Sequence, residues 1–131
     1  MTDATRFLRR SLQLDGIASG LTGALLLVAA GPVSALIGLS VPAVARVIGA
    51  LLAVYATALL WNAARARVSR VETVAAVALN AAWVLGSIAV IEFGPLTPLG
   101  NVAVAAIALA VLAFAVLEVV GLRRLREAGA S

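Results

Sequence analysis

The residues of this chain that could do chemistry are few, and two of them are acidic residues within long apolar stretches. Asp15 lies five residues after Arg10, and Glu118 lies five residues before Arg123. An ionisable side chain inside a membrane segment is a candidate functional group, because it is costly to keep there. If the two carboxyl groups face each other on neighbouring helices, they can hold a proton and exchange it for a cation. If each instead pairs with a nearby arginine, they only anchor the helix ends.

Polar and aromatic side chains also lie deeper in the apolar segments. Asn80 lies about 14 Å along its helix from the start of its segment. An asparagine at this depth usually hydrogen-bonds across helices, which contributes roughly 0.6–2 kcal/mol. Alternatively, a cleft for an apolar or cationic small molecule is lined by Asn80, Asn62, Trp83 and Trp61. Trp61 and Tyr55 are otherwise interfacial or packing aromatics.

Two opposite charges lie near the ends of the second and third apolar segments that are farther from the arginine-rich turn between those segments. Arg46 opens the second apolar segment, and Glu92 closes the third. A surface ion pair between Arg46 and Glu92 is the simplest interpretation. The alternative is an outward-facing pair that binds a ligand or gates a pathway.

The composition excludes several kinds of chemistry. The chain has no cysteine and no histidine, and its ten basic residues are all arginine. Disulfides, thiol or imidazole catalysis, haem ligation by His or Cys and soft metal sites are therefore excluded. Phosphate-binding, nucleophile-elbow, zinc-protease and dinucleotide motifs are absent as well. We expect no catalytic residue, no cofactor and no metal site, and hence no enzyme.

The elements that position these side chains are predicted to be membrane-spanning helices. The 131 residues are 63% hydrophobic, with a mean hydropathy of +1.12, whereas soluble domains are about 45–50% apolar. Four apolar segments, each long enough to cross about 30 Å of hydrocarbon as a helix, cover approximately residues 12–31, 43–64, 71–92 and 101–122. We therefore expect an all-α integral membrane four-helix bundle, up-down-up-down, as a single transmembrane domain over residues 1–131.

Prolines and glycines are predicted to separate these helices. Gly31-Pro32 ends the first helix, and the sequence FGPLTPLG ends the third. The segment 32–42 is too apolar for an ordinary loop. It is either a short interfacial helix or a re-entrant hairpin, which survives at depth only when it is buried in protein or lines water.

Arginine clusters predict the direction of the spans. Nine of the ten arginines lie in three clusters, at residues 6–10, 65–70 and 123–126. Cytoplasmic segments carry an excess of arginine and lysine, so both termini and the turn between the second and third helices are predicted to be cytoplasmic. Anionic lipid head groups account for the basic charge, and no basic stripe with interleaved aromatics indicates nucleic acid. The alanine-rich, all-arginine composition indicates a bacterial inner membrane protein. The first apolar run is too long for a typical signal peptide and further spans follow it, so we expect it to be retained as a helix.

Small residues predict how the first helix packs. Gly16, Gly20 and Gly23 lie on one face and include one GxxxG motif. Such faces let helix backbones approach closely in lipid. The face packs either against another helix of the same chain or against a second copy in a homo-oligomer.

In length and span count the chain resembles the small multidrug resistance transporters. Those proteins carry a glutamate in the middle of their first helix with aromatic side chains around it. Here the acid is Asp15, near the helix end, and the first span has no aromatic residue. The resemblance therefore implies no function for this chain.

Three functions remain open after these exclusions. The first is a non-catalytic structural or accessory subunit, which self-assembles or joins a larger membrane complex. The second is a minimal oligomeric transporter or channel for protons or small cations. The third is a binder of a hydrophobic ligand such as a lipid, quinone or pigment.

Overall fold

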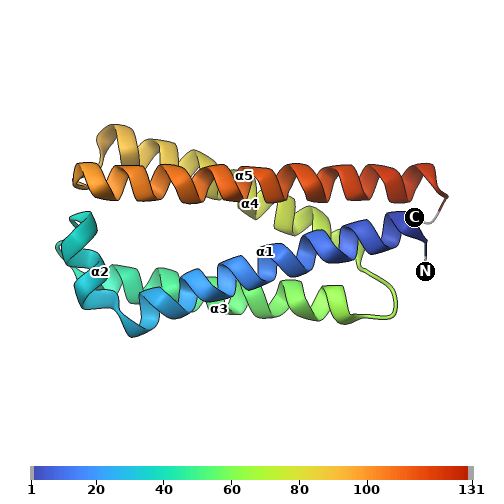
Figure 1. Cartoon of the computed structure of the whole chain (residues 1–131), viewed down its shortest axis with the longest axis horizontal. Helices are drawn as coiled ribbons and strands as arrows, with labels where there is room; N and C mark the ends of the chain where they lie inside the picture. Colours follow the sequence, from blue (N-terminus) through green and yellow to red (C-terminus); the bar gives the residue numbers. More distant parts are fainter. Residues whose placement is uncertain (1, 130–131) are drawn as a thin grey trace.

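The computed structural model describes residues 2–129 and is all-helical over that range, as predicted. Its helices, in chain order, are α1 (Asp3–Val28), α2 (Ala30–Ile37), α3 (Pro42–Ala64), α4 (Arg70–Phe93) and α5 (Pro98–Glu127) (Figure 1). Four of them, α1, α3, α4 and α5, are long and apolar enough to cross a membrane, which confirms the four predicted spans. The chain is a multi-pass membrane protein.

Two helices extend well beyond their predicted bounds. α1 begins at Asp3 instead of near residue 12, and α5 continues to Glu127 instead of ending near residue 122. The hydroxyl of Thr2 accepts a hydrogen bond from the backbone N–H of Thr5 at 3.1 Å and caps α1 at its start. Arginine is a good helix former, so the helices continue through the arginine clusters into the polar region. Hydropathy located the membrane-spanning part of each helix but not its ends.

The first span ends earlier than predicted, and a separate short helix follows it. α1 stops at Val28, and Ala29 leaves helical geometry with φ −116° and ψ 33°. Pro32 lies in the first turn of α2 rather than at the end of α1. If α1 continued, the proline ring would clash with the carbonyl of Val28, four residues earlier. Of the two interpretations of residues 32–42, the structure shows a short helix and no hairpin within that segment.

The end of α2 is tied to the start of α5. The backbone N–H of Thr97 donates to the carbonyl of Ile37 at 3.0 Å, and its hydroxyl donates to the carbonyl of Leu36 at 2.9 Å. Gly38 has a φ of 89°, and a Cβ there would lie 2.8 Å from the nitrogen of Thr97. A Cβ on Gly100 would overlap the carbonyl oxygen of Ile37. Both positions therefore need glycine for this close approach.

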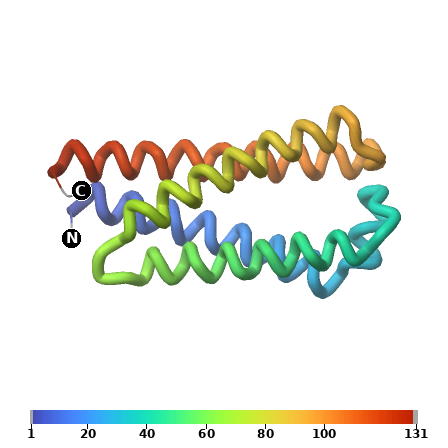
Figure 2. Tube along the Cα trace, turned by 180° about the vertical axis from the view of Figure 1, so that it is seen from behind, coloured from blue at the N-terminus to red at the C-terminus, as the bar shows by residue number. Residues whose placement is uncertain are grey.

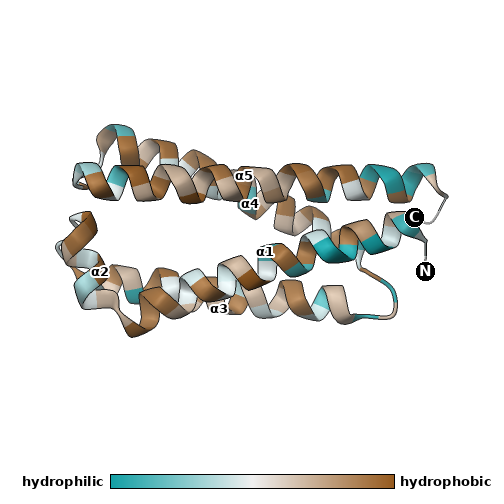
Figure 3. Cartoon of the chain, in the orientation of Figure 1, coloured by the Kyte–Doolittle hydropathy of each residue, from teal (hydrophilic) through white to brown (hydrophobic). Residues whose placement is uncertain are grey.

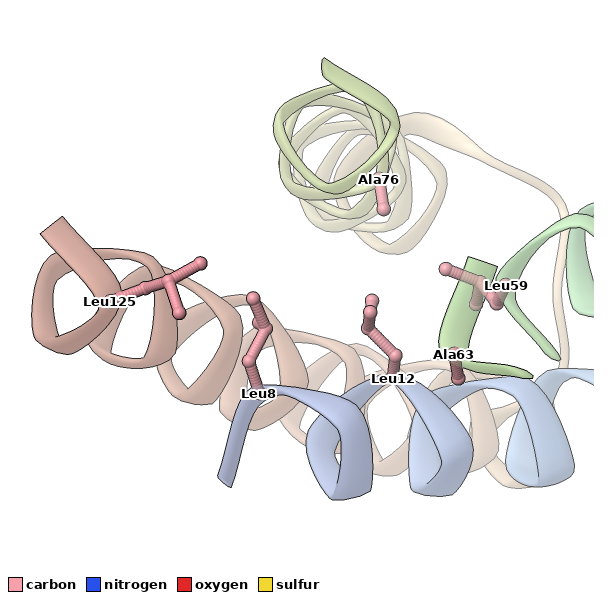
Figure 4. Close-up of a cluster of buried hydrophobic side chains, with 6 residues drawn as sticks. All are labelled: Leu8, Leu12, Leu59, Ala63, Ala76 and Leu125. Atoms are coloured by element: carbon pink, nitrogen blue, oxygen red, sulfur yellow. The ribbon is translucent and has the colours of Figure 1, made fainter. Parts of the chain in front are cut away.

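The four long helices form two pairs that diverge. α1 packs along α3, α4 packs along α5, and α1 also contacts α5. Figures 1 and 2 show the two pairs close together where α1 begins and α5 ends, and apart toward α2. The main cluster of buried apolar side chains, drawn in Figure 4, lies at the close end, because Leu8 and Leu12 are near the start of α1 and Leu125 is near the end of α5. Its six side chains are Leu8, Leu12, Leu59, Ala63, Ala76 and Leu125.

The close end also carries the three arginine clusters, and we call it the arginine end. The start of α1, the turn between α3 and α4 and the end of α5 all lie there (Figure 1). Hydrophilic residues are concentrated at this end, whereas the ribbons elsewhere are mostly hydrophobic (Figure 3). Figure 1 thus places both ends of the chain on one side of the bundle, as an even number of spans requires.

The glycine face of α1 packs against α3 of the same chain. A Cβ added to Gly23 would lie 2.8 Å from the carbonyl oxygen of Gly49, and a Cβ on Gly49 would lie equally close to that of Gly23. A Cβ on Gly16 would lie 2.9 Å from Leu60, whereas one on Gly20 would meet α3 at ordinary contact distance. This face is therefore occupied within the chain.

Gly23→Ala is expected to destabilise the protein by about 1–3 kcal/mol, because the new methyl group meets a backbone oxygen that cannot move aside alone. The matched control is Gly86→Ala in α4, where an added Cβ meets nothing within 4 Å. The control is expected to gain about 0.5–1 kcal/mol, because alanine costs less than glycine in a helix. Thermal unfolding in detergent, followed by circular dichroism, measures both. Equal stability of the two variants would contradict the close packing of α1 on α3.

Candidate functional site

Four polar side chains, one from each long helix, meet where the two helix pairs begin to diverge. They are Asp15 from α1, Tyr55 from α3, Asn80 from α4 and Glu118 from α5. Asp15 is 1% exposed, Asn80 3% and Glu118 0%. The structure thus brings together the two acids that the sequence suggests as a pair, adds Asn80, which was predicted separately, and adds Tyr55. We call these four residues the polar cluster.

Asn80 is the centre of the polar cluster. Its amide nitrogen donates to Oδ2 of Asp15 at 3.0 Å and to Oε1 of Glu118 at 3.4 Å. Its amide oxygen accepts the hydroxyl hydrogen of Tyr55 at 2.8 Å. The hydroxyl of Ser19 donates to Oδ1 of Asp15 at 3.2 Å. One asparagine therefore holds the side chains of three other helices in register.

The two carboxyl groups share the amide nitrogen of Asn80 as a donor, and neither pairs with an arginine in the described part of the chain. The salt bridges within residues 2–129 join Arg6 to Asp3 and Arg65 to Glu72, so neither buried acid has a cationic partner there. Oε2 of Glu118 is buried and has no hydrogen-bond partner among the described residues. Because unpaired buried charge costs several kcal/mol per ion, such a pair needs a bound proton or a bound cation.

A cleft extends from the polar cluster toward the α2 end of the bundle. Its volume is about 570 Å³, and all four long helices line it. Tyr55 and Asn80 form its polar floor together with Ser19. Its walls are apolar, and its aromatic side chains besides Tyr55 are Trp83 and Phe114. The cleft exists because the small residues of α1 hold it on α3 while α4 and α5 diverge from that pair.

Asn62, a predicted cleft residue, lies elsewhere. It is 1% exposed, and its amide oxygen accepts the backbone N–H of Ser69 at 2.7 Å. Its amide nitrogen donates to the hydroxyl of Thr73 at 3.2 Å. Asn62 thus holds the turn between α3 and α4, about two helical turns from Tyr55 along α3.

The predicted pair between Arg46 and Glu92 does not form among the residues that the structure describes. Both side chains are exposed, and neither takes part in a salt bridge there. The physical reason is the divergence of the two helix pairs, since these residues lie on α3 and α4 near the wide end.

The contacts of two side chains, Tyr55 and Arg9, were not predicted from the sequence. The sequence predicts Tyr55 only as a packing or interfacial aromatic residue, although it lies ten residues before Arg65 and Asn80 lies ten residues after Arg70. That equal depth was the available signal. The sequence predicts Arg9 only as one of the arginines that face lipid head groups. Its guanidinium instead donates to the carbonyl of Ala63 and, at 2.6 Å, to the carbonyl of Arg65. No local pattern distinguishes Arg9 from the other arginines.

The arrangement can hold a proton or a cation on two buried carboxyl groups that accept hydrogen bonds from Asn80, a residue of the cleft floor. The described residues contain no group of three or more His, Cys, Asp or Glu side chains placed to hold a metal ion. Comparisons with protein-family models, with curated proteins and with solved structures found no match to this chain.

Proposed function

We propose that this chain is a protein of the bacterial cytoplasmic membrane whose arginine end faces the cytoplasm. The excess of arginine at one end of the bundle supports this orientation through the positive-inside rule. The alanine-rich, all-arginine composition supports the bacterial origin.

Its proposed function is to bind a positively charged, mainly apolar small molecule in the cleft. One observation carries this proposal: an apolar cleft of about 570 Å³ has two buried carboxyl groups beside its floor and no arginine paired with them. An apolar ligand fits the walls, and its positive charge balances the acids. Pockets of this size with a few convergent polar groups are typical of small-molecule sites.

Aromatic side chains support a cationic ligand in particular. Trp83, Tyr55 and Phe114 all line the cleft. The faces of aromatic rings attract cations, by about 0.5–2 kcal/mol each. A neutral ligand of equal size would gain the apolar contacts but neither the aromatic nor the carboxyl attraction.

Titration with tetrabutylammonium tests the proposal. Trp61 is 66% exposed and does not line the cleft, so Trp61→Phe leaves Trp83 as the single fluorescent tryptophan. We expect a saturable change in Trp83 fluorescence in detergent. Neutral tributylphosphine oxide is expected to bind at least about tenfold more weakly, because a tenfold loss of affinity corresponds to the loss of one charge-assisted contact.

A matched pair of variants locates the binding. Ala110 lines the cleft, whereas Ala113 on the same helix is exposed and does not. Ala110→Leu is expected to weaken tetrabutylammonium binding, and Ala113→Leu is expected to leave it unchanged. Equal affinity for the phosphine oxide, or no saturable signal, contradicts the proposal. A second protein chain bound in every particle by native mass spectrometry, without tetrabutylammonium binding, would instead support an accessory subunit.

A further inference from the structure

A second cavity lies at the arginine end, between α1 and α5. Its volume is about 360 Å³. Three arginines line it: Arg6 and Arg10 from α1 and Arg124 from α5. It shares no lining residue with the cleft. Its lining also differs in charge, because the side chains that line the cleft are all uncharged, whereas three arginines border this cavity.

The arginines of this cavity keep much of their positive charge. Arg6 pairs with Asp3 at 3.2 Å, but the Asp3 side chain is 99% exposed, and such surface pairs are weak. Arg10 is exposed and forms none of the salt bridges found in residues 2–129. The guanidinium of Arg124 lies 4.5 Å from the centre of the Phe7 ring, which holds it in place without neutralising it. Three cations and one carboxylate thus give the cavity a net charge of +2.

The cavity also has an apolar part, which lies deeper in the bundle. Leu14 follows Arg10 by one helical turn, and Leu117 precedes Arg124 by about two turns. Both leucines therefore lie on the membrane side of the arginines. Leu14 is 55% exposed although it borders a cavity, so its side chain is available to an apolar ligand.

We propose that this cavity binds an anionic phospholipid, with its phosphate between Arg10 and Arg124 and its acyl chains along Leu14 and Leu117. Guanidinium groups bind phosphate oxygens in pairs of hydrogen bonds, which gives geometric specificity. Basic pockets between helices at the cytoplasmic side are suited to such head groups. Free phosphate would use only the basic half of the cavity, so the apolar half favours a lipid.

Native mass spectrometry with dioleoylphosphatidylglycerol as the probe tests this proposal. We expect one tightly bound phosphatidylglycerol per chain and weaker binding of zwitterionic dioleoylphosphatidylcholine. The double variant Arg10→Gln/Arg124→Gln is expected to bind phosphatidylglycerol about 10- to 30-fold more weakly. Both arginines are exposed, so the fold does not depend on burying them.

The control carries the same loss of charge at the same end of the bundle. Arg67 and Arg126 are exposed and do not line the cavity, so Arg67→Gln/Arg126→Gln is expected to keep the bound lipid. An equal loss in both double variants would overturn the proposal, because it would show general attraction to basic charge. Displacement of the lipid by millimolar inorganic phosphate would also overturn it in favour of a free-phosphate site.

Discussion

Asn80→Leu is expected to destabilise the bundle by about 2–4 kcal/mol, although leucine suits a membrane helix better than asparagine does. The amide of Asn80 donates to Asp15 and Glu118 and accepts from Tyr55. Its removal takes a hydrogen bond from each of these side chains, of which Asp15 and Glu118 are fully buried and Tyr55 is partly buried, and each loss costs about 1–3 kcal/mol when nothing replaces it. Chemical unfolding in mixed micelles, followed by circular dichroism, measures the change.

The informative comparison is with a variant that removes the acids as well. In Asp15→Leu/Asn80→Leu/Glu118→Leu no buried carboxyl group remains, and replacing buried ionic groups by apolar ones is often neutral or stabilising by about 1–4 kcal/mol. We therefore expect the triple variant to be at least as stable as the unmodified protein, and to have lost tetrabutylammonium binding. Ala82→Leu, at an exposed position of α4, controls for the added leucine. A triple variant less stable than Asn80→Leu would assign the polar cluster to folding instead of binding.

Arg9→Gln is expected to lower stability by about 2–4 kcal/mol, more than any exposed arginine substitution. The guanidinium of Arg9 donates to the carbonyls of Ala63, Arg65 and Ala66, at and just beyond the end of α3. The last carbonyls of a helix have no partner within it and carry partial negative charge, so a cation there satisfies both needs. Thermal unfolding in detergent measures the loss.

Two further variants separate hydrogen bonding from charge. Arg9→Lys keeps the charge but replaces the planar fork by a single ammonium group, so we expect it to recover only part of the stability. Arg67→Gln removes an exposed arginine from the neighbouring turn and is expected to change stability by less than about 0.5 kcal/mol. If Arg9→Gln and Arg67→Gln behave alike, the contact between Arg9 and α3 does not stabilise the fold.

The sequence predicts the number of spans and the gathering of arginines at one end, because both follow from the cost of placing charge in hydrocarbon. It does not predict the helix ends, since a helix continues into water wherever its residues allow it. It offers a short helix over residues 32–42 as one of two interpretations but does not place the start of α2 at Ala30, because the effect of Pro32 falls on the residues before it. These features depend on local backbone geometry rather than on hydropathy.

The site could be predicted only in part for a related reason. Asp15, Glu118 and Asn80 are recognisable as polar residues in apolar segments. Which of them meet depends on how each helix is rotated, and segments that are apolar all round carry no periodic signal of rotation. Two exceptions are the glycines of α1, which fix its rotation against α3, and the polar residues Thr73, Asn80 and Ser87, which are spaced seven residues apart and mark the buried face of α4. The divergence that separates Arg46 from Glu92 and forms the cleft is likewise a property of the whole bundle.

The uneven distribution of packing has a mechanical consequence. The large core side chains lie at the arginine end, whereas the opposite end is joined by the hydrogen bonds of Thr97 to α2. The two helix pairs are therefore packed firmly together at the arginine end and joined only lightly at the α2 end. Segments held by few buried contacts open at low free energy, so amide hydrogens near Thr97 and α2 should exchange with solvent sooner than those at the arginine end.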